Sequence, residues 1–119
     1  MSKTKKTIIA TLIVALIMPS AWAHVKNEMG ERIAKTGSNN LPACAVCHGE
    51  HGQGDIKVGY PRLAGMNAAY LDQQLNLYAQ DLRQNLVMKD YAQKLSVEER
   101  RAVSAYYARQ QANPPHVYL

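Results

Sequence analysis

Two cysteines and a histidine stand together in the stretch Cys44-Ala45-Val46-Cys47-His48, and the chain contains no other cysteine. The spacing C-x-x-C-H is the attachment pattern of a c-type haem. Two thiols three positions apart can each add to one vinyl group of the ring, and the histidine that follows can supply one axial ligand to iron. We therefore expect this chain to fold around one covalently bound haem c.

Other uses of a C-x-x-C pair fit this chain less well. A thioredoxin-like redox pair needs a neighbouring βαβ pattern, and a structural zinc site needs four Cys or His ligands in paired clusters. Neither context is present in the sequence. A disulfide between Cys44 and Cys47 would close a very short loop, which gains little on the loop-closure model.

The first 23 residues have the composition of a secretory signal. Three lysines lie among the first six residues, an apolar run extends from Ile8 to Met18, and Ala21-Trp22-Ala23 forms a small-x-small cleavage site. The apolar run is too short to span a membrane, which takes about 20 residues. The pattern predicts a cleaved signal peptide at residues 1–23, a single domain at residues 24–119, a periplasmic location and no stable membrane insertion.

The basic character of the chain comes largely from this segment. The net charge is +5 with 14 Lys and Arg against 9 Asp and Glu, and it falls to +2 once the three early lysines are removed. No basic cluster interleaved with aromatic residues follows, so we expect no nucleic-acid partner. The remaining domain is small and has no Phe, so a buried haem should supply much of its apolar core.

Three helices are predicted, with the haem motif between the first and the second, so the fold class is all-α. The first is expected over residues 27–36, the second over 67–84 and the third from Ser96 to about Gln110. Gly30 either allows another helix to cross closely or weakens its own helix, and the sequence leaves both open. Residues 49–59 contain four glycines and should form a loop.

The second and third helices carry clear patterns. The second is expected to bury Leu71, Leu75, Tyr78 and Leu82 and to expose Asp72, Gln73, Asn76 and Gln80. The third begins with a capping box, Ser96-Val97-Glu98-Glu99, and should bury Val103, Tyr106 and Tyr107.

A second axial ligand should face His48 across the iron. The candidates are Met29, Met66, Met88, His24, His51 and His116. Met29 lies on the apolar stripe of the first helix, His51 is too close to His48 to reach the opposite face, and His24 and His116 lie near the ends of the domain. Spacing favours Met88, in the predicted connection between the second and third helices, over Met66.

Several ordered blocks resemble class I cytochromes c, and most closely the single-haem relatives of the cytochrome c4 and c553 group. They extend across nearly the whole domain and comprise Pro42-Ala43-Cys44 to His48-Gly49, Tyr60-Pro61-Arg62-Leu63-Ala64-Gly65, Tyr70-Leu71 with Gln74-Leu75, Arg83, Asn85, Met88, and Leu95-Ser96 through Tyr106-Tyr107. Met66 is a departure, because the family usually has Gln after the Leu-Ala-Gly run.

The resemblance implies a role for each matching residue. Cys44 and Cys47 would hold the haem, with His48 and Met88 as its axial ligands. The Pro61 carbonyl would accept a hydrogen bond from the imidazole of His48. The first and last helices would cross near Gly30 and Tyr106 or Tyr107, and the propionates would be contacted by Arg62, Tyr70, Gln74 and Arg83.

A haem with His and Met ligands has no open position for substrate, and thioether ligation favours the ferrous state. We therefore expect an electron carrier rather than an enzyme, with redox proteins as transient donor and acceptor. The alternative is a haem c subunit of a multi-subunit oxidoreductase. A gas sensor or peroxidase-like enzyme would require a weak or absent distal ligand. The oligomeric state is left open.

Overall fold

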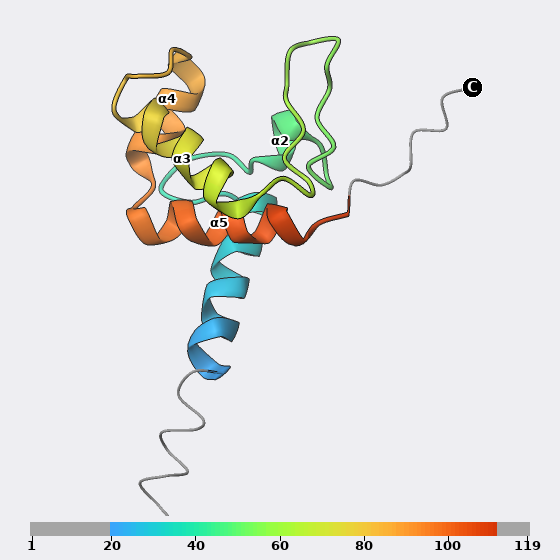
Figure 1. The fold of residues 1–119 in the computed structure, drawn as a ribbon, viewed down its shortest axis with the longest axis vertical. Helices are drawn as coiled ribbons and strands as arrows, with labels where there is room; N and C mark the ends of the chain where they lie inside the picture. The colour runs from blue at the N-terminus through green and yellow to red at the C-terminus, as the bar shows by residue number, and fades with distance from the viewer. Residues whose placement is uncertain (1–19, 112–119) are drawn as a thin grey trace, which may run out of the picture.

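A computed structural model describes residues 20–111 as a helical protein (Figure 1). A helical segment over residues 20–35 is followed by α2 (Ala45–His48), α3 (Ala68–Ala79), α4 (Leu86–Lys94) and α5 (Val97–Arg109). The two β-bridges in this part of the chain, Ser38 with Leu41 and Asp55 with Tyr60, are isolated and belong to turns. The all-α class is confirmed. None of the helices in the described part is long and apolar enough to cross a membrane.

The expected signal segment lies largely outside the described residues, which begin at position 20. The sequence predicts the first helix over residues 27–36, and the helical segment covers residues 20–35. Of its expected apolar stripe, Ile33 is buried, Met29 is half-buried against the core, and Val25 is exposed.

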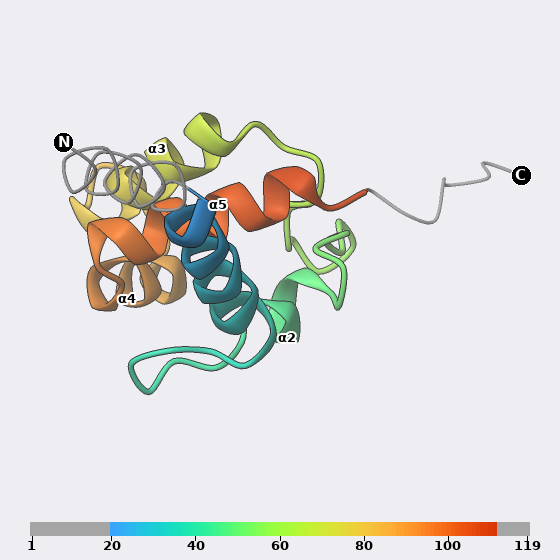
Figure 2. The ribbon, with the colours of Figure 1, turned by 90° about the horizontal axis from the view of Figure 1, so that it is seen from below.

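The helical segment 20–35 crosses α5 steeply, as the two views in Figures 1 and 2 show. A Cβ atom at Gly30 would overlap the carbonyl oxygen of Ala102 and would stand 3.0 Å from the Cβ atom of Tyr106. Only a residue without a side chain permits this approach of two backbones. Gly30 is therefore a crossing point, as the resemblance implied, and not merely a weak position in its helix.

The start of α5 forms as the sequence predicts. The Ser96 hydroxyl accepts a hydrogen bond from the Glu99 amide, and the Glu99 carboxylate accepts one from the Ser96 amide. The same carboxylate also accepts hydrogen bonds from Ser38 at 2.8 Å and Asn39 at 3.0 Å. This group thus joins the turn after the first helix to the start of the last one. Val103, Tyr106 and Tyr107 are buried on α5, as predicted.

The prediction of one helix over residues 67–84 was wrong at its C-terminal end. α3 stops at Ala79, and Asp81 adopts a φ of 61°, a left-handed conformation that interrupts a helix. A new helix, α4, then starts after Asn85, whose side chain accepts a hydrogen bond from the Met88 amide. The predicted loop between the second and third helices therefore contains a helix.

The predicted faces of α3 are correct only in part. Leu71 and Tyr78 are buried and Leu75 is half-buried, but Leu82 lies beyond the helix and is 70% exposed. On the side that was expected to be solvated, Gln73 and Gln80 are exposed, whereas Asp72 and Asn76 are half-buried. The reason is that α3 packs against α5, where Arg100 donates a hydrogen bond to Asn76 at 3.1 Å.

Candidate functional site

The C-x-x-C-H motif forms the short helix α2, which Cys44 precedes and His48 ends. The His48 amide donates to the Cys44 carbonyl at 2.9 Å, so the helical turn brings the two thiols and the imidazole to one wall of a cavity. Gly49 follows with a φ of 88°, which stops the helix immediately after the histidine.

His48 is buried and its orientation is held by the backbone of Pro61. The His48 Nδ1 atom lies 2.8 Å from the Pro61 carbonyl oxygen. A carbonyl oxygen can only accept, so Nδ1 is the donor, and in the neutral ring this tautomer leaves the lone pair on Nε2. This is the contact that the resemblance to class I cytochromes c implied, and it prepares Nε2 to bind a metal.

The loop between α2 and α3 positions Pro61 beside the histidine. Its turns are closed by backbone hydrogen bonds from Gly54 to the His48 carbonyl at 2.7 Å and between Asp55 and Tyr60 in both directions. A Cβ atom at Gly54 would lie 2.7 Å from the carbonyl carbon of Pro61, so this glycine lets the two parts of the loop approach closely.

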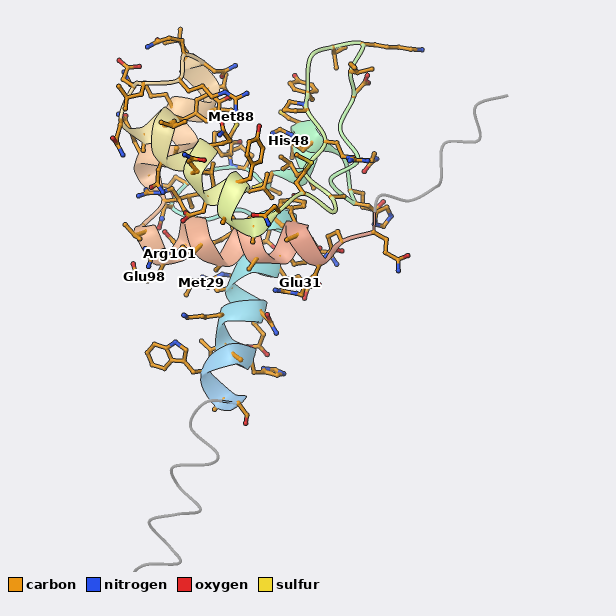
Figure 3. The ribbon with its side chains drawn as sticks, viewed as in Figure 1. Met29, Glu31, His48, Met88, Glu98 and Arg101 are labelled. Atoms are coloured by element: carbon orange, nitrogen blue, oxygen red, sulfur yellow. The ribbon has the colours of Figure 1, made fainter. Side chains whose placement is uncertain are left out.

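A cavity of about 710 Å³ opens between α2 and this loop on one side and α3 and α4 on the other. Figure 3 shows His48 and Met88 on its two opposite sides. Met88 lies in the first turn of α4, not in a loop as the sequence indicated, and Asn85 caps that turn. The capped first turn of α4 therefore fixes the position of the Met88 thioether in the cavity wall.

Every site residue proposed from the sequence lines this one cavity. These residues are Cys44, Cys47, His48, Pro61, Arg62, Tyr70, Gln74, Arg83 and Met88. Met66 lines it as well and packs against the hydrophobic core. Arg83 Nη1 donates to Gln74 Oε1 at 2.5 Å, and the guanidinium lies 4.8 Å from the centre of the Tyr78 ring.

The other candidate ligands lie elsewhere. Met29 and His51 are not among the residues that line the cavity. His24 is exposed and stands 3.2 Å from Glu28 on its own helix. His116 is outside the described residues.

Several residues that line the cavity are not evident from the sequence. Tyr91 was missed because α4 was not recognised, although Asn85 before an apolar run is a helix-start signal. Tyr107 and Ser104 also line the cavity from α5. The apolar pattern of the last helix predicts that Tyr107 is buried, but helical periodicity does not distinguish a core from the wall of a cofactor cavity.

Cys44 and Cys47 are both free thiols. Burial raises the pKa of the Cys44 thiol to about 11, so it is protonated at neutral pH. Its sulfur lies 3.8 Å from the Ile33 carbonyl oxygen, to which the thiol donates. No group of three or more His, Cys, Asp or Glu side chains within residues 20–111 is arranged to hold a metal ion directly.

The donor set fits a haem c. One wall offers two thiols, from cysteines three positions apart, and an imidazole nitrogen, and the opposite wall offers a thioether. Leucines, valines and tyrosines line much of the remaining space, which suits a flat apolar ring.

Comparisons with known proteins agree with this geometry. The family model described as cytochrome c matches residues 28–110. The chain is 42% identical over 91 residues to a thiosulfate dehydrogenase electron acceptor of Thiomonas intermedia, covering 76% of this chain and 36% of that protein. It is 35% identical over 81 residues to cytochrome c-554(548) of Halomonas halodenitrificans, covering 66% and 96% respectively.

The fold has a close counterpart among solved structures. Reduced recombinant cytochrome c4 from Pseudomonas stutzeri matches with a TM-score of 0.70 and 31% identity, over 73% of this chain and 49% of that one. The chain thus spans about half the length of that cytochrome c4 and about a third of the thiosulfate dehydrogenase electron acceptor.

Proposed function

Because this chain belongs to the cytochrome c family, whose members carry covalent haem c and transfer electrons, we propose that it is a periplasmic one-electron carrier. When bound, the haem supplies an iron that alternates between Fe(II) and Fe(III). The observation that supports this most strongly is the pairing of His48 and Met88 across one cavity (Figure 3).

Each site residue has a defined task in this proposal. Cys44 and Cys47 hold the ring, His48 Nε2 and the Met88 sulfur bind the iron, and the Pro61 carbonyl holds the imidazole in place. Arg62, Tyr70, Gln74 and Arg83 line the same cavity and can donate hydrogen bonds, so we assign them to the propionates. With His48 and Met88 both acting as ligands, the site would leave no position at which a substrate could bind, which suits electron transfer.

The ligand assignment is tested by visible spectroscopy of purified holoprotein. Met88→Ala should abolish the weak sulfur-to-iron absorption band of the oxidised protein and lower the reduction potential. Met66→Ala is the matched control, because Met66 lines the same cavity, and it should leave both nearly unchanged. The reverse result would assign the distal position to Met66.

Rapid carbon monoxide binding by the reduced wild type would argue for an open iron and against a carrier.

A second candidate function is that of a haem subunit in a larger oxidoreductase. One relative is named as the electron acceptor of thiosulfate dehydrogenase. In this chain Val58 and Val87 stand exposed at the cavity, with Ile56 and Leu86 close to them in sequence at 94% and 86% exposure. Exposed apolar side chains at a redox centre suit a protein partner.

The two candidates differ in the size of the native particle. In size-exclusion chromatography of a native periplasmic extract, a free carrier should elute as a small haem protein. A permanent subunit should co-elute with a catalytic partner.

Mass spectrometry of the same haem protein would show whether it begins at His24, as cleavage after Ala23 requires.

A further inference from the structure

The hydroxyl group of Tyr107 is buried without an evident role. Tyr107 is 3% exposed, and its hydroxyl oxygen has no hydrogen-bond partner among residues 20–111. A buried phenol normally finds such a partner, because an unsatisfied hydroxyl costs about 1–3 kcal/mol. The position of this hydroxyl group therefore indicates that its hydrogen-bond partner is present only when a further group is attached to the chain.

The ring of Tyr107 is held firmly from several sides. It rests on the backbone of Gly52, where an added Cβ atom would lie 2.6 Å from ring carbons. The neighbouring Tyr106 ring meets it edge to face, with centroids 5.2 Å apart. The Tyr107 carbonyl accepts a hydrogen bond from the Gly65 amide at 3.0 Å. The hydroxyl consequently has little freedom to search for another partner.

Cys44 lies beside this ring. Both residues line the cavity, and Cys44 packs against the core cluster to which Tyr107 belongs. The two groups also affect one another's titration. Burial is the main cause that raises the pKa of each, and their contact is a further one, which lowers the pKa of the thiol and raises that of the phenol.

The hydrogen-bonding role of the Cys44 sulfur changes when the sulfur is attached to the haem. The free thiol has one proton, which it donates to the Ile33 carbonyl. When the thiol adds to a vinyl group, that proton passes to a vinyl carbon as the sulfur–carbon bond forms. The thioether sulfur can then only accept a hydrogen bond. The unpartnered phenol beside it is a donor.

We propose that Tyr107 is a positioning residue whose hydroxyl donates a hydrogen bond to the thioether sulfur of Cys44. The inference rests on the proposed haem attachment. The positive end of the Tyr107 O–H dipole would point toward the thioether sulfur and so toward the edge of the haem. Because the ferric state carries one more positive charge than the ferrous state, this dipole disfavours oxidation and raises the reduction potential.

The test compares Tyr107→Phe with Tyr106→Phe in purified holoprotein by redox titration. Each variant loses one hydroxyl from a buried ring of α5, but Tyr106 does not line the cavity. Tyr107→Phe should raise the ratio of ferric to ferrous protein at a fixed potential by about two- to fivefold, part of the energy of one hydrogen bond. Tyr106→Phe should leave that ratio unchanged, and the sulfur-to-iron band should persist in both.

A shift of equal size in both variants, or in neither, would overturn the inference. A measurement on the wild type avoids dependence on how the variants fold: exchange into D₂O should shift the thioether carbon–sulfur vibration in the resonance Raman spectrum, and an unshifted band would contradict the hydrogen bond. Failure of the proposed carrier function would look different from failure of this hydrogen bond. In that case the wild type would lack a low-spin c-type haem spectrum altogether.

Discussion

The Nδ1 atom of His48 and the carbonyl oxygen of Pro61 are 2.8 Å apart, although 13 positions separate them in the chain. This contact fixes the ring nitrogen that carries the proton, and it makes the free nitrogen a better electron donor. Its length depends on a loop that folds back at Gly54, a glycine in close contact with Pro61.

Gly54→Ala should therefore alter the redox properties through the histidine. The added methyl group would displace Pro61 and lengthen its hydrogen bond to His48, which makes the imidazole a weaker donor and raises the reduction potential. Gly59→Ala is the matched control. Gly59 also has a positive φ, of 84°, but an added Cβ atom there meets nothing within 4 Å. Redox titration should show the shift in Gly54→Ala only, and an equal shift in both would indicate general backbone strain.

Gly30→Ala should lower the free energy of unfolding by about 1–3 kcal/mol, the usual cost of overpacking. At a free helical position the same change would stabilise the protein by about 0.5–1 kcal/mol. The sign therefore reports whether the backbone crossing with Ala102 exists in solution. Denaturant unfolding of the holoprotein measures it, with Asn27→Ala on the exposed face of the same segment as control. A stabilised Gly30→Ala protein would contradict the crossing.

Acid should weaken the connection between the Ser38 turn and α5. Burial alone would raise the pKa of the Glu99 carboxyl, but hydrogen bonds from Ser96, Ser38 and Asn39 outweigh it and hold the pKa below 4.5. A pKa depressed in the folded state contributes stability above the unfolded value, and that contribution is lost as pH falls through the folded value.

Glu99→Gln should accordingly flatten the loss of stability below pH 4.5 and lower stability at neutral pH. Thermal unfolding of the holoprotein between about pH 3 and pH 7 would show both effects. Glu98→Gln, a substitution at an exposed position in the same turn, serves as the reference. A pH profile of Glu99→Gln that parallels that of the wild type would show that this carboxylate is not linked to folding.

Removal of the haem should abolish cooperative folding. Without the haem, the leucine, valine and tyrosine side chains that line the cavity of about 710 Å³ would lose their apolar partner and face water. A small domain has a thin apolar core and a stability of only about 5–15 kcal/mol, so it tolerates such a loss poorly. The double variant Cys44→Ala, Cys47→Ala should lose the near-ultraviolet circular dichroism of packed tyrosines and its calorimetric transition. A sharp transition near that of the holoprotein would contradict this expectation.

Which residues line this site can be predicted from the sequence better than how the helices around it are arranged. The spacing of Cys44, Cys47 and His48 is a local property, and so is the capping box at Ser96, because both depend on residues a few positions apart. The junction between α3 and α4 depends on a single left-handed residue, Asp81, which an apolar stripe does not reveal. The half-buried positions Asp72 and Asn76 on the polar side of α3 are not evident from the sequence, because Asn76 acquires its partner, Arg100, from another helix.

Ser38 and Glu99 are hydrogen-bonded across 61 positions of the chain, and α2, α3 and α4 all lie between them. The parts of the cavity wall that these helices contribute therefore belong to one long segment of the chain, whose two ends are joined by this hydrogen bond. Loop-closure entropy opposes the contact between Ser38 and Glu99 until the intervening helices have formed, so we expect this contact to form late in folding. Haem attachment at α2 needs only local structure, so it can precede closure. A chain that ends before α5 should still acquire its haem, but it should leave the ring open to water.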